Sequence, residues 1–512
     1  MTKSLWQKID IDESKSLHES KNCEICIVGA GISGLTAAYR LTSQGMKVVV
    51  IHAGDLRAGE TSKSTAQINT VHDDGWADML ELHGEENIRL CYQSYVHATS
   101  FIEKLITEKN LDCGYEKIAG YLFTESEQEG QKWVDGEYAA ALKAGVTGLS
   151  KVKATPLPEY QKGPALLYED QAQLQPLSYL SELRRLLLQS GLCEIYGHAG
   201  VKEIEEGETH VTLFLDDGKE ITASKVILAT NVPIHRKLIP IEALAAYRSY
   251  VVAFRVKKNS IPRYQYWDTQ DPYHFVRLEG GASNIDHPAG DSEILLVGGE
   301  DHRVGDVVDI ENHYKTLTEW GRKHFPVIDV TGLRWSAQTI ETFDGMPLIG
   351  ACDSNRGRVY IITGDSGTGM THGTIGGLLL ADKLVNKSLP WEKLYNPSRS
   401  RTKSLKRWVG ENIKNLVSYQ DWLTPGEVSS VDEIESESGA IIREGTSKLA
   451  VYRDSSGKLT KLSAVCPHLG ALVRWTAVEK SWDCPAHGSR YSPTGQVLNG
   501  PATCALSCLH PK

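Results

Sequence analysis

Two short motifs near the end of the chain restrict what its C-terminal part can be. Cys466-Pro-His468 is followed, after fifteen residues, by Cys484-Pro-Ala-His487. Zinc sites usually pair cysteine with cysteine and histidine with histidine. Here each motif mixes the two residue types, which suits a centre in which one metal takes two sulfur ligands and another takes two nitrogen ligands. A single zinc ion held by all four side chains is the alternative.

The two motifs resemble those of the Rieske [2Fe–2S] family, and the similarity extends to Gly500-Pro-Ala and to Trp475 and Trp482. The resemblance implies a small antiparallel β domain whose cluster transfers one electron at a time. It also implies that the two histidines lie at the exposed tip of the cluster. The expected ligands are Cys466, His468, Cys484 and His487.

This sequence departs from the high-potential members of that family. Ala471 and Ala486 occupy positions where those proteins carry a disulfide between the two loops, whereas Ser489 and Tyr491 match their hydroxyl positions. Hydrogen bonds to the sulfur atoms stabilise the reduced cluster. We therefore expect an intermediate reduction potential, within the Rieske range of about −150 to +300 mV.

A dinucleotide-binding fingerprint lies near the N-terminus. An apolar run at 24–28 is followed by Gly29-Ala-Gly31-Ile-Ser-Gly34, an apolar-periodic helix at 35–41 and a second apolar run at 47–51. This strand, G-x-G-x-x-G, helix and strand order is the context in which the motif binds a pyrophosphate at the helix N-terminus. The expected cofactor contacts here are Gly29, Gly31, Ile32, Ser33 and Gly34.

The acidic residue that normally ends the second strand and binds a ribose hydroxyl is missing. The chain has His52 at this position, followed by Ala-Gly-Asp55. Either His52 makes the ribose contact or Asp55 reaches it from the loop. A loop histidine without a ligand role is a third reading of His52.

A second glycine-rich helix start favours FAD over NAD. An apolar run at 359–363 leads into Gly364-Asp-Ser-Gly367-Thr-Gly369-Met370, and an apolar strand at 226–231 ends in small residues. A flavin ring needs backbone contacts that a nicotinamide does not. Val201 precedes the 226–231 strand in a segment expected near the adenine.

Together these features resemble the D-amino-acid-oxidase-like FAD oxidoreductases, which include enzymes that oxidise sarcosine, glycine and γ-glutamylputrescine. The similarity covers nearly the whole chain, including 266–278, 297–302 and the loop at 59–67. It implies non-covalent FAD, because no cysteine or histidine occupies the usual flavin-attachment positions. The further flavin contacts that it implies are Ser64, Thr65, Ala66, Gln67, Val201, Ala229, Thr230, Gly350, Gly367, Gly369 and Met370.

The expected architecture is α/β with an additional all-β domain. A Rossmann-like FAD-binding domain is expected at 22–66, 178–233 and 325–396, and an antiparallel-sheet substrate domain at 67–177 and 234–324. A helical linker at 397–423 would lead to the Rieske domain at 424–512.

Composition excludes several function classes. The net charge of −10 over 512 residues argues against nucleic acid as a partner. No eighteen-residue apolar run is present, so no membrane span is expected. The polar N-terminal segment does not resemble a signal peptide, and the ten scattered cysteines fit a cytoplasmic protein with reduced thiols.

The family resemblance implies oxidation of a C–N bond in an amine or amino acid to an imine, with electrons passing through FAD and the cluster to an external one-electron acceptor. His72 could act as the base, and Tyr273 and Arg277 could face the substrate, with Arg277 binding a carboxylate. Structural roles for His72 and Arg277 are the competing interpretation. The alternative function is a non-enzymatic flavin and iron–sulfur redox protein, either a sensor or an electron-transfer component.

Overall fold

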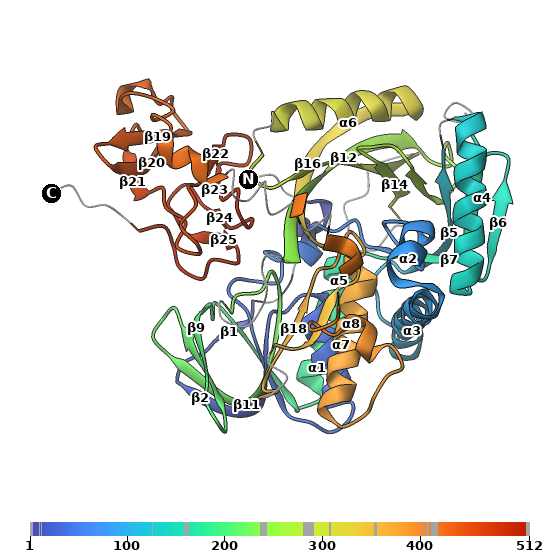
Figure 1. Ribbon diagram of the computed structural model, residues 1–512, viewed down its shortest axis with the longest axis horizontal. Helices are drawn as coiled ribbons and strands as arrows, with labels where there is room; N and C mark the ends of the chain where they lie inside the picture. The colour runs from blue at the N-terminus through green and yellow to red at the C-terminus, as the bar shows by residue number, and fades with distance from the viewer. Residues whose placement is uncertain are drawn as a thin grey trace.

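The structure is a computed structural model that describes residues 4–507 apart from 10, 12, 125, 158–162, 236–242, 280–290, 307–308, 353–355, 401, 406–408 and 411–417. Its strands form two large sheets and two small ones. Figure 1 shows the C-terminal β domain, in orange and red, set beside the region where the two larger parts meet.

The first large sheet carries the fingerprint. Its central strands are parallel, and β3 is buried along its whole length, as expected for a sheet covered on both faces. Helices α1 (Ile32–Thr42), α5 (Pro176–Gln189) and α7 (Gly369–Leu384) belong to this part. The strands, in spatial order, are β1 (Lys15–Ser16), β8 (Cys193–Gly197), β3 (Val48–Ile51), β2 (Lys21–Val28), β11 (Glu220–Asn231), β10 (Val211–Leu215) and β9 (Val201–Glu206), with β18 (Val359–Thr363) beside β11 and β17 (Leu348–Ala351) beside β18.

The second large sheet is antiparallel except where β13 pairs with β5 in parallel. Helix α6 (Ile310–His324) packs on β12, β15 and β16, and α2 (Trp76–His83), α3 (Glu85–Lys109) and α4 (Glu127–Ala144) pack together at the other end (Figure 1). The strands, in spatial order, are β16 (Val327–Thr342), β12 (Leu244–Lys257), β15 (Ser292–Arg303), β14 (His274–Leu278), β13 (Gln265–Asp268), β5 (Glu116–Phe123), β7 (Ala165–Gln173) and β4 (Gln67–Ile68), with β6 (Leu149–Val152) beside β7.

One expected boundary differs from the sheet topology. Strand β16 pairs with β12 along most of its length, so 327–342 belongs to the second sheet although the sequence places the FAD-binding segment from 325 onward. The polypeptide returns to the first sheet only at β17. Alternating apolar residues in β16 do not reveal which sheet they complete.

The C-terminal domain contains a three-stranded and a four-stranded antiparallel sheet. Its core includes the fully buried Trp482, whose ring lies 4.8 Å from that of Trp475. Short helical turns precede its first strand, namely α8 (Glu392–Tyr395), η4 (Thr402–Ser404), η5 (Ser418–Leu423) and η6 (Val431–Glu433). Its strands are β19 (Ser438–Glu444), β20 (Ser447–Arg453), β21 (Leu459–Ser463), β22 (Arg474–Thr476), β23 (Ser481–Asp483), β24 (Arg490–Tyr491) and β25 (Val497–Asn499).

The expected fold class is therefore confirmed: a Rossmann-like part, a largely antiparallel second sheet and a small β domain. Within the described part of the chain, no helix combines the length and apolar character that crossing a membrane requires.

Candidate active site

The fingerprint turn depends on glycine at two positions. Gly29 has φ +113°, and a Cβ there would lie 2.2 Å from the carbonyl oxygen of Ala229. A Cβ on Gly34 would lie 1.9 Å from the carbonyl oxygen of Gly29. The backbone of β2, the start of α1 and the end of β11 thus meet without intervening side chains, as the fingerprint requires.

Helices α1 and α7 converge on the same cavity. Gly373 and Gly377 of α7 allow this, because a Cβ on Gly373 would lie 2.7 Å from Ile32 Cγ2 and one on Gly377 would lie 2.8 Å from the Ser33 carbonyl oxygen. Neither N-cap residue caps its helix with its own side chain, and the Ile32 N–H of α1 donates to Thr61 Oγ1 at 3.2 Å. The other N–H groups at the two helix N-termini provide a site for a pyrophosphate and for an electron-rich ring.

The cavity has a volume of about 810 Å³, which falls in the range of large cofactor sites. Most of the expected FAD contacts line it, from both helix N-termini and from the end of β11. Glycine-rich backbone and uncapped helix starts fit a flavin dinucleotide. The expected residues in its wall are Gly29, Gly31, Ile32, Ser33, His52, Ser64, Thr65, Val201, Ala229, Thr230, Gly367, Gly369 and Met370.

Four expected contacts lie behind the wall instead. Gly34 provides the close turn described above. Ala66 has φ +52° and its N–H donates to Ser64 Oγ at 3.0 Å, while Gln67 accepts a hydrogen bond from the Trp267 indole at 3.4 Å. Gly350 packs against Pro397, with 2.6 Å between a built Cβ and Pro397 Cδ. These residues shape the site from outside the cavity.

His52 and Asp55 both line the cavity, so the replacement for the ribose-binding acid stays a prediction with two candidates. His52 Nε2 lies 3.0 Å from Ser14 Oγ, and burial lowers the pKa of His52 to about 4. The ring is therefore neutral and can donate or accept one further hydrogen bond. Asp55 is held by Arg57, whose Nε donates to Oδ2 at 3.1 Å.

The four expected cluster ligands form two pairs. The interaction of the Cys466 and Cys484 thiols lowers the pKa of Cys466 to about 6 and raises that of Cys484. The rings of His468 and His487 lie 5.1 Å apart. One sulfur pair and one nitrogen pair fit a [2Fe–2S] cluster with differently ligated irons.

The histidine pair is not fully exposed, which corrects the expected exposed tip: His468 is buried and His487 is partly exposed. His468 is only 5% exposed, and burial together with the positive charge of Arg303 lowers the pKa of His487 to about 4. The histidine side of the C-terminal domain faces the larger part of the molecule, where a Cβ on Gly305 would lie 2.0 Å from Pro485 Cα.

Tyr491→Phe should lower the reduction potential of the cluster. The Tyr491 hydroxyl lies 3.0 Å from Cys466 Sγ, and a hydroxyl that donates to a ligand sulfur stabilises the added electron. If that bond favours the reduced cluster by about 1.4 kcal/mol, its loss lowers the potential by about 60 mV. Protein film voltammetry measures this, and we expect Ser489→Ala to act in the same direction.

Tyr452→Phe is the matched control, because its ring packs on Trp475 at 5.3 Å in the same domain. A Tyr491→Phe potential equal to that of the unmodified protein would show that the hydroxyl does not tune the cluster.

Of the three expected substrate residues, Tyr273 lines the cavity. Its hydroxyl donates to Asp301 Oδ2 at 3.4 Å, and burial raises its pKa, so it remains protonated. Tyr273 can therefore orient a substrate but is not a ready base.

Arg277 has a structural role, which corrects the expected carboxylate contact. It is 1% exposed; its Nη2 donates to Glu279 Oε2 at 3.0 Å and its Nη1 to the Leu174 carbonyl at 3.0 Å. Arg277 Nη1 also donates a hydrogen bond to the Thr65 carbonyl, which holds the flavin-contacting loop against β14. The guanidinium is thus occupied by protein partners outside the cavity.

His72 also has a structural role. The Asp74 N–H donates to Nδ1 at 3.1 Å, so the ring proton is on Nε2, which lies 3.1 Å from the Gly345 carbonyl. The ring is 1% exposed and stacks on Tyr95 at 6.1 Å. Both nitrogens are engaged by backbone, so this geometry does not support the expected role as a base.

Sequence reasoning missed a set of carboxyls that we call the acidic group. Three of them, Asp73, Asp301 and Glu341, lie near Tyr273, and the fourth, Asp365, lies near Asp73 and Glu341. Asp365 lines the cavity, and a Cβ on the cavity residue Gly367 would lie 2.2 Å from Asp73 Oδ2. The four carboxyls come from separate segments of the chain, so no local sequence motif predicts that they lie together.

Dehydration raises the pKa values of the acidic group, and repulsion within the group adds to it at Asp73 and Glu341. Burial is the main cause, and it raises the pKa of Asp365 to about 6 and that of Asp301 to about 7. Asp73 keeps an accessible side chain although protein surrounds it on most sides, and with Asp74, Asp301 and Asp365 nearby its pKa rises to about 8. A cation bound here would relieve this repulsion.

Comparison with known families agrees with the geometry. The FAD dependent oxidoreductase family matches residues 24–383, and the Rieske [2Fe-2S] domain family matches residues 421–510. The chain belongs to the FAD-dependent oxidoreductases and carries a Rieske domain at its C-terminus. FAD and a [2Fe–2S] cluster are accordingly its cofactors.

Two relatives illustrate its place among these proteins. YhfW of Bacillus subtilis, named for a Rieske 2Fe-2S iron-sulfur centre, is 28% identical over 96% of this chain and 94% of its own length. The γ-glutamylputrescine oxidoreductase of Escherichia coli is 24% identical over 72% of this chain and 85% of its own length.

Solved structures share the fold of the larger part. Glycine oxidase from Geobacillus kaustophilus matches 74% of this chain and 99% of its own with a TM-score of 0.58 and 15% identity. L-proline dehydrogenase from P. horikoshii matches 74% of this chain and 98% of its own with a TM-score of 0.57 and 16% identity.

Proposed function

We propose that this protein is an amine dehydrogenase that oxidises a C–N bond to an imine and sends the electrons singly through the Rieske cluster to an external one-electron acceptor. Bound FAD supplies the two-electron acceptor, and the cluster supplies the one-electron carrier. The observation that carries the proposal is one cavity lined by the dinucleotide fingerprint, by Tyr273 and Asp365, and by the Rieske domain. An oxidase would need no cluster, because oxygen takes electrons from a flavin directly.

The acidic group favours a positively charged amine as substrate. Carboxylates around Tyr273 attract an ammonium group and repel a substrate carboxylate. The Tyr273 hydroxyl can orient the amine from the cavity wall. Asp301, with a pKa of about 7 and a hydrogen bond from Tyr273, can hold or take a proton near neutral pH.

Relatives support the bond that is oxidised. The names of several similar proteins specify amine or amino-acid donors: γ-glutamylputrescine oxidoreductase, glycine oxidase and L-proline dehydrogenase. All three names give a redox activity on a nitrogen-containing donor. In this chain Arg277 is paired with Glu279 and does not offer its guanidinium to a substrate carboxylate.

An anaerobic titration with a panel of amines tests the proposal. The panel includes polyamines, N-methylated glycines, D-amino acids and proline-like imino acids. We expect bleaching of the flavin absorbance together with the EPR signal of the reduced Rieske cluster, strongest for amines that lack a carboxylate near the reacting carbon.

Cys484→Ser serves as the control, since it should keep flavin bleaching and lose the EPR signal. If no member of the panel bleaches the flavin in protein that dithionite reduces, the non-enzymatic redox function becomes the better account.

A further inference from the structure

The Rieske domain is attached to the rest of the protein through a buried charge. Glu479 of the Rieske domain accepts a hydrogen bond from Arg248 Nη2 of β12 at 2.6 Å and further ones from Ser336 of β16 and Arg490 of β24. All three charged side chains are at most 5% exposed. Burial alone would raise the pKa of Glu479, but the two arginines hold it well below its usual range.

Such a buried group fixes one relative position of the domains. A carboxylate removed from water needs its partners at hydrogen-bonding distance, so sliding or rotation of the interface would leave buried charges unpaired. The adjoining backbone contacts are equally close. A Cβ on Gly488 would lie 2.5 Å from Ala246 Cβ, which leaves no space for solvent between the cluster loop and β12.

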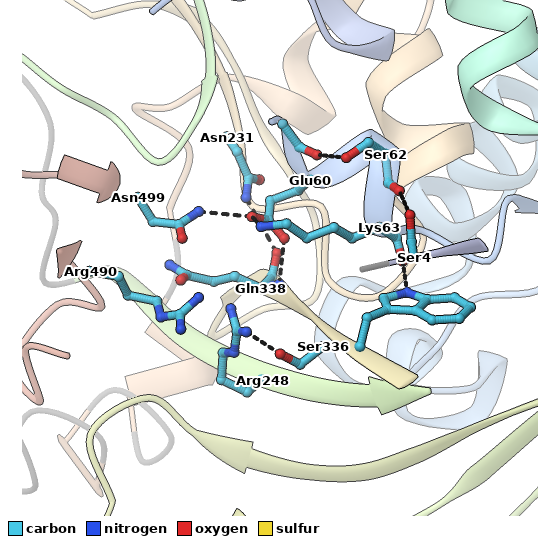
Figure 2. Close-up of polar contacts among 12 residues, drawn as sticks. Ser4, Glu60, Ser62, Lys63, Asn231, Arg248, Ser336, Gln338, Arg490 and Asn499 are labelled. Atoms are coloured by element: carbon cyan, nitrogen blue, oxygen red, sulfur yellow. Dashed lines mark hydrogen bonds and ion pairs between the residues drawn. The ribbon is translucent and has the colours of Figure 1, made fainter. Parts of the chain in front are cut away.

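The loop that carries a histidine ligand touches a residue of the flavin cavity. Gln338 lines the cavity, and its Nε2 donates to the carbonyl of Gly488, next to His487, at 3.2 Å. The Gln338 N–H donates to Glu60 Oε2 at 2.7 Å, and Asn499 Nδ2 of the Rieske domain donates to Glu60 Oε1 at 2.8 Å. Figure 2 shows Glu60 between Asn499 and Gln338, with Arg248 and Arg490 close by.

The Rieske domain also forms part of the cavity itself. Residues 496–500 and 502–505 line the same space as the fingerprint glycines. A Cβ on Gly500 would lie 3.5 Å from Ile234 Cγ2, which is ordinary contact. Glycine oxidase, whose whole length matches only the larger part of this chain, illustrates the fold without this wall.

We propose that the Rieske domain is a fixed wall of the flavin site, that its cluster takes electrons only from the flavin of its own chain, and that Glu479 is the positioning residue that holds it there. With both cofactors bound, the reduced flavin would give up one electron in each transfer and one ferric ion of the cluster would become ferrous. An external one-electron acceptor would then restore the ferric ion. Two such transfers would reoxidise the flavin, and the proton of the reduced flavin would go to solvent.

A light-driven experiment tests transfer within one chain. The flavin is photoreduced by blue light with EDTA as the electron donor, so that the FAD of the protein is itself the light-absorbing group, and the EPR signal of the cluster is followed across a wide range of protein concentrations. We expect a first-order rate that does not change with concentration. Because no amine substrate is involved, this result stands or falls separately from the proposed amine oxidation, on which only its physiological role rests.

Mixing two variants tests more directly whether electrons pass between chains. Cys484→Ser protein retains FAD but lacks the cluster, whereas Gly29→Ala protein should retain the cluster but lack FAD. We expect no reduced-cluster signal when the mixture is photoreduced. A signal that grows with the concentration of either variant would overturn transfer confined to one chain.

Glu479→Gln tests the positioning role through FAD retention as well as through electron transfer. We expect the dissociation constant for FAD to rise, and transfer from flavin to cluster to slow, by roughly tenfold or more, because one buried charge of the interface is lost. The potentials of the two cofactors should stay unchanged. Glu437→Gln is the matched control, since its pair with Lys480 in the same domain is 52% exposed at Glu437.

Asn499→Ala keeps the test decisive if Glu479→Gln fails to fold, because it removes only the bond to Glu60. We expect faster FAD release and greater hydrogen exchange at 484–490 and 496–500. If the variant that folds retains FAD, exchange and transfer rates like those of the unmodified protein, the fixed wall is refuted.

Discussion

Gly29→Ala should yield folded protein that carries the Rieske cluster but no FAD. The new methyl group would lie 2.2 Å from the Ala229 carbonyl oxygen, well inside contact distance, on a residue with φ +113°. Both obstacles are backbone, so no side-chain rotation relieves them. The end of β11 must therefore move away. Ala229 and Thr230, which belong to it and line the cavity, would move with it.

The measurement is the FAD content per cluster after purification, read from absorbance, together with FAD binding to the apoprotein by fluorescence quenching. We expect at least about a hundredfold weaker binding, which corresponds to about 2.7 kcal/mol. The cluster EPR spectrum reports that the remainder of the protein is folded.

Gly45→Ala is the control for conformational strain alone. Gly45 lies in the same strand–helix–strand unit with φ +84°, but a Cβ there meets no atom within 4 Å. Its replacement should cost about 1 kcal/mol of stability and leave FAD binding intact. Equal FAD loss in both variants would show that strain, rather than the clash with β11, empties the site.

Backbone-determined features could be predicted from the sequence. The fingerprint strand, turn and helix were expected at 24–41 and occur as β2 and α1, and the second glycine-rich helix occurs as α7. The glycines can be recognised in the sequence because their spacing is set by the turn that they form. The two mixed cysteine and histidine motifs can also be recognised, because the two ligands of each motif lie within one short loop and so have a fixed spacing.

Side-chain partnerships across the chain could not be predicted. The sequence predicts that Arg277 is a free cation on a strand. In the structure, Glu279 and the carbonyls of Thr65 and Leu174 accept its hydrogen bonds. Glu279 is two residues away, but the loops that supply the two carbonyls are 212 and 103 residues away in sequence. His72 fails for the same reason, because Gly345 occupies its Nε2.

The interface between the domains left no sequence signal. Glu479, Gln338 and Asn499 are ordinary polar residues, and nothing near them specifies that a second domain will cover them. Their role follows from where two sheets place them, as the pairing of β16 with β12 does for Gln338. Such contacts can be identified only after the sheets are assembled.

Asp301→Asn should weaken binding of a cationic amine strongly at pH 8.5 and hardly at all at pH 5.5. The pKa of Asp301 is raised to about 7, with Asp365 at about 6 and Asp73 at about 8. A raised pKa means that the carboxyl is protonated and neutral below that pH and attracts a cation only above it. Amines with a pKa near that of lysine, about 10.4, stay protonated throughout this range.

Affinity for the amine should therefore rise with pH between about 6 and 8 in the unmodified protein, and the Asp301→Asn profile should be flatter. At pH 8.5 the loss of one ion pair in a dehydrated site should raise KM by about tenfold to a hundredfold, or about 1.4 to 2.7 kcal/mol. At pH 5.5 the protonated aspartic acid and the asparagine are both neutral, so the two proteins should bind alike. The readout is KM against pH, with kcat as a separate parameter.

Asp170→Asn is the matched control, because this β7 carboxyl is 56% exposed and pairs with Lys117 on the surface. Its KM should follow the unmodified protein at every pH. An affinity that falls as pH rises, or an Asp301→Asn effect of equal size at pH 5.5 and 8.5, would show that the amine does not bind as a cation against Asp301. The acidic group would then serve the stability of the fold, and the substrate would have to be sought among neutral or anionic compounds.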